Sequence, residues 1–232
     1  MCRRGHGKKN RVSETRPIIG ITMGDPVGIG PELICLALNR PEVYEAARPL
    51  VIGDVRIMEA SRKVTGTNHV IASINIPCAG HFKPGCIDVL NISNLDLNSI
   101  FWGHPTLASG RAMIDYINTA VNLALADDIA AVVTCPINKT AMKMVGSRFP
   151  GHTELLAERT RTSRYAMMMA GSRLRVVLVT IHLALRDVVA SLSIDKIRTT
   201  ISVTYDALKE RFGIDAPRIA VAGLNPHAGE NG

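Results

Sequence analysis

The stretch PIIGITMGDPVGIGPELICLAL, residues 17–38, contains an apolar run, a glycine-rich turn and a second segment in which the apolar residues are spaced differently. Residues 17–23 are rich in isoleucine, as is typical of a buried β-strand. The apolar residues of 32–38 are spaced as on one face of a helix, and Pro31 suits a first-turn position. The stretch therefore predicts a strand, a tight turn and a helix.

The same alternation continues along the chain. Further strands are predicted at 50–53, 70–74, 129–134, 176–181 and 218–222, and further helices at 55–62, 107–126, 139–145, 154–159 and 194–212. Residues 76–100 contain proline, glycine and short apolar runs, and they interrupt this alternation. They predict a lobe boundary or a strand extension. Strands that alternate with helices predict an α/β fold with a mostly parallel sheet and flanking helices.

Composition narrows the class of protein. The chain has 232 residues, of which 47% are hydrophobic, so it can bury a core and we expect one or two globular domains. No apolar run approaches the roughly 18 residues of a membrane helix, and the N-terminus lacks a signal-like apolar stretch. We therefore expect a cytoplasmic protein without a membrane partner.

The positive charge is concentrated at the N-terminus. The formal net charge is +7, but residues 1–16 hold six basic residues against Glu14, which leaves +2 for the rest. A basic segment with little apolar content predicts a solvated, disordered tail. A nucleic-acid arm is the weaker alternative, since no aromatic residues or recognition motif accompany it, and we expect no nucleic-acid partner.

The cysteines predict no disulfide framework. There are five, an odd number, without a CxxC pair and mostly within apolar segments. Buried free thiols in a reducing compartment fit this pattern.

Two loops that follow predicted strands have the composition of ligand-binding loops. The first, at 24–32, places glycines at a helix start, where free N–H groups attract phosphate, but its spacing fits neither a Walker loop nor a dinucleotide fingerprint. A structural turn capped by Asp25 is the alternative. In the second loop, Asn138 is a plausible helix cap, and Lys139 either faces an anion or is solvated.

Three histidines predict a site for a metal ion and an oxyacid. His152 and Thr153 lie at a predicted helix start, where N–H groups, an imidazole and a hydroxyl can bind an oxyanion. His182 ends one predicted strand and His227 lies in the loop after another, at strand ends where ligands bind in open α/β sheets. Two imidazoles there suit a divalent ion that has a third ligand. The other histidines, His6, His69, His81 and His104, show no partner motif.

Five ordered motifs resemble the 4-hydroxythreonine-4-phosphate dehydrogenases of pyridoxal phosphate biosynthesis. The matching segments are 21–32, 134–139, 150–154, 182–187 and 224–230. The resemblance implies a two-lobed fold like that of the isocitrate and isopropylmalate dehydrogenases, with interleaved lobes within residues 17–232. It also implies a homodimer that binds NAD or NADP and a divalent metal (zinc, magnesium or cobalt).

The implied reaction oxidises and decarboxylates 4-phosphohydroxy-L-threonine to 3-amino-2-oxopropyl phosphate. By the resemblance, His152 and Thr153 contact substrate, and His182 and His227 ligate the metal. Members of the family continue for roughly another hundred residues, which hold the third metal histidine. We therefore expect a C-terminally truncated domain with little or no activity.

Two other functions compete with this one. Relatives that act on D-threonate or D-erythronate 4-phosphate share the motifs, and the segment 134–139 does not separate the substrates. A protein of another class, a non-catalytic metal- or phosphate-binding fragment, would bind ions without hydride transfer.

Overall fold

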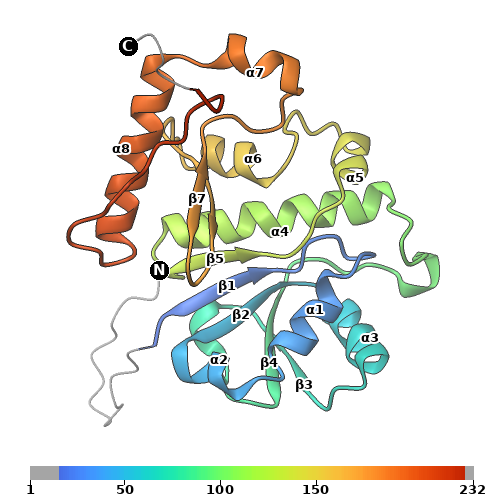
Figure 1. The fold of residues 1–232 in the computed structure, drawn as a ribbon. Helices are drawn as coiled ribbons and strands as arrows, with labels where there is room; N and C mark the ends of the chain where they lie inside the picture. Colours follow the sequence, from blue (N-terminus) through green and yellow to red (C-terminus); the bar gives the residue numbers. More distant parts are fainter. Residues whose placement is uncertain (1–15, 228–232) are drawn as a thin grey trace. The chain divides into compact units, whose positions relative to one another are not determined.

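The computed structural model describes residues 16–227, in two compact units that divide between Thr160 and Arg161. The first unit contains a parallel sheet in the order β3-β4-β2-β1-β5 (Figure 1). Its strands are β1 (Ile18–Thr22), β2 (Arg48–Gly53), β3 (Val70–Ile74), β4 (Cys86–Asn91) and β5 (Ala131–Thr134).

Helices cover both faces of this sheet. In Figure 1, α1 and α3 lie on one side of it and α4 on the other. The helices of the unit are α1 (Gly30–Ala37), α2 (Pro41–Ala46), α3 (Val55–Thr65), α4 (Leu107–Leu125), α5 (Lys139–Met144) and α6 (His152–Arg159), with short 3-10 turns η1 (Pro77–Ala79) and η2 (Leu97–Ser99). The predicted α/β class, with a parallel sheet and flanking helices, is confirmed for this unit.

Local chemistry explains where the helices begin. Asp54 starts α3 because its carboxylate accepts hydrogen bonds from the N–H groups of Arg56 and Ile57. Thr106 and Ser109 form a reciprocal capping box at the start of α4. Pro31 lies in the first turn of α1, as the sequence predicts.

The core of the first unit has two clusters. The larger lies around β2, whose residues from Pro49 to Gly53 are all buried, as expected of a strand covered on both faces. The smaller joins α4, α5 and α6 through Met113, Met142 and Leu155. This second cluster packs α5 and α6 against α4.

The second unit is smaller and more open. It contains an antiparallel hairpin of β6 (Met167–Ala170) and β7 (Arg175–Leu178), followed by α7 (Leu185–Ser191) and α8 (Ile194–Glu210). Within residues 161–227, the buried side chains are those of Thr204 and Leu208. Leu185 is 88% exposed and Ile194 is 83% exposed.

Two sequence predictions need correction. Residues 76–100 contain β4, a full strand between β3 and β2, where the sequence predicted only a lobe boundary or a strand extension. Residues 218–222 form no strand in the described part of the chain, because no neighbouring strand there pairs with them.

The tail predicted over residues 1–16 lies outside the described residues except for Arg16. The Arg16 guanidinium donates to the carbonyl of Tyr44, and its own carbonyl accepts from Nε of Arg48 at 2.7 Å. Arg16 is thus part of the fold. Among the described helices, none combines the length and the apolar character that a membrane crossing requires. Of the described cysteines, Cys35, Cys86 and Cys135 are buried thiols and Cys78 is exposed.

Candidate substrate and metal site

The loops that leave β1 and β5 touch each other at the carboxyl end of the sheet. Gly24 has φ +75°, and a Cβ built on it would lie 2.3 Å from the carbonyl oxygen of Pro136. The N–H of Asp25 donates to that same oxygen at 2.9 Å. Glycine is required here by the left-handed backbone and by the close approach of the second loop.

Asp25 stabilises the turn from within. Its side chain is buried and its Oδ1 accepts a hydrogen bond from the N–H of Val27 at 3.1 Å. Burial raises the pKa of the Asp25 carboxyl, while hydrogen bonds from Val27 and from the Asn138 side chain oppose this. The carboxylate thus stabilises the turn between β1 and α1, whereas the start of α1 has no side-chain cap.

The loop after β5 ends in a capped helix. The side-chain oxygen of Asn138 accepts from the N–H of Ala141 at 3.0 Å and so caps α5, as predicted. Lys139 is the first residue of α5 and is exposed. Its ammonium group is therefore accessible to an anionic ligand at this edge.

His152 has the strongest ligand signature of the three predicted histidines. It is the first residue of α6, and its Nε2 is buried without a hydrogen-bond partner. Burial lowers the pKa of the His152 imidazole, so the ring is neutral near pH 7. A buried ring nitrogen without a partner costs free energy, and a bound ligand would satisfy it.

The start of α6 offers further donors beside His152. Its N-cap residue, Gly151, has no side chain to accept the N–H groups of the first turn. Thr153 follows His152 and is half-buried. Backbone N–H groups, a hydroxyl and a neutral imidazole therefore lie within one helical turn, and this donor set suits an oxyanion.

His182 and His227 lie in the second unit and are both exposed. His182 is four residues beyond the end of β7 and has φ +56°, a left-handed conformation that histidine adopts more readily than most residues. Within residues 16–227, neither histidine belongs to a group of three His, Cys, Asp or Glu side chains close enough to hold a metal. Their role as metal ligands stays a prediction.

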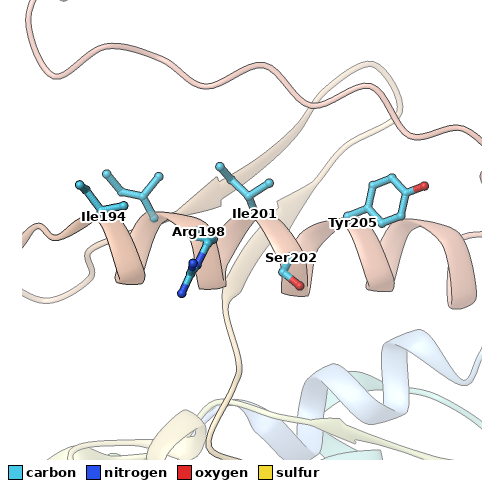
Figure 2. Close-up of a pocket in the computed structure, with 6 residues that line it drawn as sticks. Ile194, Arg198, Ile201, Ser202 and Tyr205 are labelled. Atoms are coloured by element: carbon cyan, nitrogen blue, oxygen red, sulfur yellow. The ribbon is translucent and has the colours of Figure 1, made fainter.

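A hollow on the exposed surface of α8 carries little chemistry. In Figure 2, Ile194, Ile201 and Tyr205 lie on one side of the helix, and Arg198 and Ser202 on the other. The guanidinium of Arg198 pairs with Asp195 at 2.9 Å. Apart from Arg198 and the hydroxyls of Ser202 and Tyr205 the lining is apolar, and it contains no histidine, cysteine or carboxylate that could ligate a metal.

Sequence reasoning missed one polar cluster. His81 showed no partner motif, but its Nδ1 lies 2.9 Å from Oδ1 of Asp88, with Cys86 nearby. The spacing of Cys86 and Asp88, two residues apart, was the available signal. The sequence predicted only a lobe boundary or a strand extension at residues 76–100, so this pair was not placed on one face of a strand.

Comparisons with known proteins agree with the resemblance in the motifs. The family model described as "Pyridoxal phosphate biosynthetic protein PdxA" matches residues 45–232. A 4-hydroxythreonine-4-phosphate dehydrogenase of Desulfosudis oleivorans is 57% identical over 217 residues, which are 94% of this chain and 64% of that protein. A D-threonate 4-phosphate dehydrogenase of Cupriavidus necator is 41% identical over 221 residues, which are 95% of this chain and 66% of that protein.

A solved structure shows the same fold. The crystal structure of a 4-hydroxythreonine-4-phosphate dehydrogenase from Klebsiella pneumoniae matches with a TM-score of 0.84 and 37% identity, over 95% of this chain and 66% of that one. The chain thus spans less than two thirds of the length of these relatives. The family model matches most of the chain, and the chain therefore belongs to the PdxA family of pyridoxal phosphate biosynthetic proteins.

Proposed function

We propose that this chain carries the substrate-binding part of a 4-hydroxythreonine-4-phosphate dehydrogenase. The reaction oxidises the secondary alcohol of 4-phosphohydroxy-L-threonine to a ketone, and the resulting β-keto acid loses carbon dioxide to give 3-amino-2-oxopropyl phosphate. The observation that carries the proposal is the unpartnered, buried Nε2 of His152 at the start of α6. It lies in a motif that the chain shares with dehydrogenases of this name.

His152 and Thr153 are the proposed substrate contacts. A neutral imidazole either donates or accepts one hydrogen bond at Nε2, so it orients an oxygen of the substrate without adding charge. The Thr153 hydroxyl and the first-turn N–H groups of α6 hold an anionic group. Together these groups fix the orientation of the substrate, which is the main contribution that the protein makes to a cofactor-dependent reaction.

His182 and His227 are the proposed ligands of a divalent ion, and their chemistry fits this role. Imidazole nitrogens suit zinc or cobalt, and both side chains are exposed to an incoming ion. Two imidazoles hold an ion only with a third ligand, which we place outside this chain. When bound, the ion supplies positive charge at the substrate oxygens, and the nicotinamide supplies the redox chemistry.

The remaining expectations belong to the same proposal. The cofactor is NAD or NADP, the ion is zinc, magnesium or cobalt, and the protein acts as a cytoplasmic homodimer on a small phosphorylated hydroxy acid. The 232-residue chain alone would turn over poorly, because two histidines bind a metal weakly and the cofactor site needs residues that we place outside this chain.

A second substrate is favoured by one comparison. The Cupriavidus necator relative is a D-threonate 4-phosphate dehydrogenase. The two substrates differ at one carbon, which carries an amine in one and a hydroxyl in the other. A non-catalytic metal- or phosphate-binding protein is the alternative of another class.

Binding and turnover together test the proposal. Calorimetric titration of the chain with 4-phosphohydroxythreonine and with D-threonate 4-phosphate, each beside the His152→Ala variant, measures substrate binding without turnover. We expect saturable binding of the amino substrate that His152→Ala weakens by about tenfold or more. Nicotinamide reduction, in a version extended by the C-terminal residues of a longer relative, then measures the reaction. Binding without any reduction by the extended protein would support the non-catalytic alternative.

A further inference from the structure

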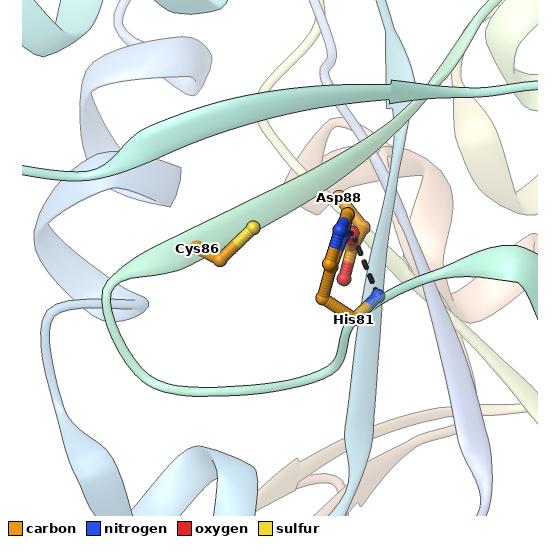
Figure 3. Close-up of side chains that lie close together, drawn as sticks. All are labelled: His81, Cys86 and Asp88. Carbon is orange, nitrogen blue, oxygen red and sulfur yellow. Dashed lines mark hydrogen bonds and ion pairs between the residues drawn. The ribbon is translucent and has the colours of Figure 1, made fainter.

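Strand β4 presents two side chains that can ligate a metal. Cys86 and Asp88 are two residues apart in an extended strand, so their side chains lie on the same face. Both residues are buried, at 4% and 1% exposure. The loop before the strand brings His81 over this face, as Figure 3 shows, and its Nδ1 lies 2.9 Å from Oδ1 of Asp88.

The loop that carries His81 is held firmly in place. The N–H groups of His81 and Phe82 donate to the two carboxylate oxygens of Asp88 at 3.0 and 2.8 Å. The Phe82 ring is buried beneath the guanidinium of Arg48, which lies 5.5 Å from its centroid. Phe82 at φ +50° and Gly85 at φ +79° turn the backbone toward β4. The backbone of His81 therefore has a fixed position beside the two strand residues.

The three side chains have nearly the spacing that a tetrahedral zinc ion requires. A ring nitrogen of His81, Sγ of Cys86 and a carboxylate oxygen of Asp88 all lie within 4.8 Å of one another. Zinc bonds of about 2.0–2.3 Å place neighbouring ligand atoms roughly 3.3–3.8 Å apart. Binding would thus open the contact between His81 and Asp88 by a few tenths of an ångström and draw the sulfur inward by about 1 Å. The His81 side chain is 53% exposed, so its ring has room to move.

We propose that His81, Cys86 and Asp88 form a zinc site with water as the fourth ligand. A donor set of thiolate, imidazole and carboxylate binds zinc in preference to magnesium or calcium. The ion would join the loop at 80–85 to strand β4, at residues that lie far along the sequence from His182 and His227.

Binding of the ion is coupled to release of a proton. Burial raises the pKa of the Cys86 thiol, the charge of Asp88 adds to this, and Lys83 opposes it. The thiol is thus protonated without the ion, and binding of Zn²⁺ releases that proton to solvent. The imidazole proton that faces Asp88 moves to the other ring nitrogen of His81, so one proton leaves for each ion bound.

Cobalt titration of the full 232-residue chain tests this site. Cobalt(II) replaces zinc in such sites, and a thiolate ligand gives it an intense near-ultraviolet charge-transfer band that histidine and carboxylate ligands do not give. We expect this band to saturate at one ion per chain and to disappear when zinc is added. An ion held by His182 and His227 alone contributes no such band, so failure of the proposed dehydrogenase site would leave this result unchanged.

Two variants test the ligands, and a third serves as the control. Cys86→Ser removes the band. His81→Ala removes a half-exposed side chain that makes one of the three hydrogen bonds to Asp88. We expect it to weaken zinc binding by more than about 100-fold, whereas loss of a hydrogen-bond partner of a ligand costs about 10- to 100-fold. Cys78→Ser, which removes an exposed thiol close to the same loop, leaves band and affinity unchanged. Absence of the band in the unmodified chain, its persistence in Cys86→Ser, or its loss in Cys78→Ser would each overturn the proposal.

Discussion

Gly24 is the residue on which the contact between the loops after β1 and β5 depends. Alanine there would adopt φ +75° with its Cβ 2.3 Å from the Pro136 carbonyl oxygen, which belongs to the backbone and cannot rotate away. We expect Gly24→Ala to lower the free energy of unfolding by about 2–4 kcal/mol, measured by urea denaturation.

Gly66 is the matched control for this substitution. It also has a left-handed backbone, at φ +68°, but a Cβ there meets nothing within 4 Å. Gly66→Ala should therefore cost only the backbone strain, about 1 kcal/mol. Equal losses for the two variants would show that the packing of the two loops contributes nothing.

His152 makes stability depend on pH in a direction that its burial sets. Burial lowers the pKa of the folded-state imidazole below its ordinary 6.5, so the unfolded chain binds the proton more readily. The stability that His152 contributes as a neutral ring is complete above pH 6.5 and falls as the pH drops toward the folded-state pKa.

The His152→Gln variant tests this dependence because its side chain does not titrate. We expect the unmodified chain to lose more unfolding free energy than the variant between about pH 7 and pH 5. His104→Gln, at an exposed histidine, should follow the unmodified chain. Identical pH profiles for the chain and for His152→Gln would contradict burial of the ring.

The sequence predicted the helix starts and caps at the candidate site, but not the burial and hydrogen bonding of the residues there. The helix start at His152 follows from Pro150 and Gly151, and the cap at Asn138 follows from its position before a helix. That Nε2 of His152 is buried and unpartnered depends on how α6 packs against α4 and α5, which no local pattern contains. Separate roles for His152 and His182 came from the family resemblance and not from the residues themselves.

At the scale of one element, the start of α6 has no side-chain cap, and we propose that its free N–H groups bind substrate. Gly151 has φ −176°, an extended backbone that serine adopts without strain, and a serine hydroxyl there would accept a first-turn N–H. We expect Gly151→Ser to raise the unfolding free energy by a few tenths of a kcal/mol. It should also weaken binding of 4-phosphohydroxythreonine in calorimetry, since the hydroxyl would occupy an N–H group that we propose for the substrate.

A cap on another helix separates these two effects. Thr106 caps α4 through the N–H of Ser109 at 3.2 Å. Thr106→Ala should cost about 1 kcal/mol of stability and leave substrate affinity unchanged. If Gly151→Ser stabilised the chain with no loss of affinity, the start of α6 would not be a substrate contact.

Helices and strands were predictable where the local apolar pattern agreed with how the segment packs or pairs in the fold. Strand β1 and helix α4 follow from their apolar periods. Strand β4 was missed because Pro84 and Gly85 precede it and a carboxylate lies within it, and Asp88 is tolerated there only because three hydrogen bonds satisfy it. Residues 218–222 show the opposite case, an apolar run without a strand partner among the described residues.

On the scale of the whole molecule, burial is distributed unevenly between the two units. The sheet of the first unit places β2 and β4 almost wholly in the core. In residues 161–227, α7 has no buried residue and the hairpin has none. Because apolar burial is the main source of folding free energy, the first unit should contribute most of the free energy of unfolding.

Native-state hydrogen exchange followed by mass spectrometry tests this distribution. We expect the amides of β1, β2 and β4 to exchange only through global unfolding, and those of β6, β7 and α7 to exchange through local opening, at rates higher by about 100-fold or more. Gly24→Ala should accelerate exchange in the first set and leave the second unchanged, since the local openings of the second unit do not require the loops after β1 and β5 to separate. A common rate for both sets, changing together in the variant, would mean that the two units unfold as one and that the sparse core of residues 161–227 is stabilised through the first unit.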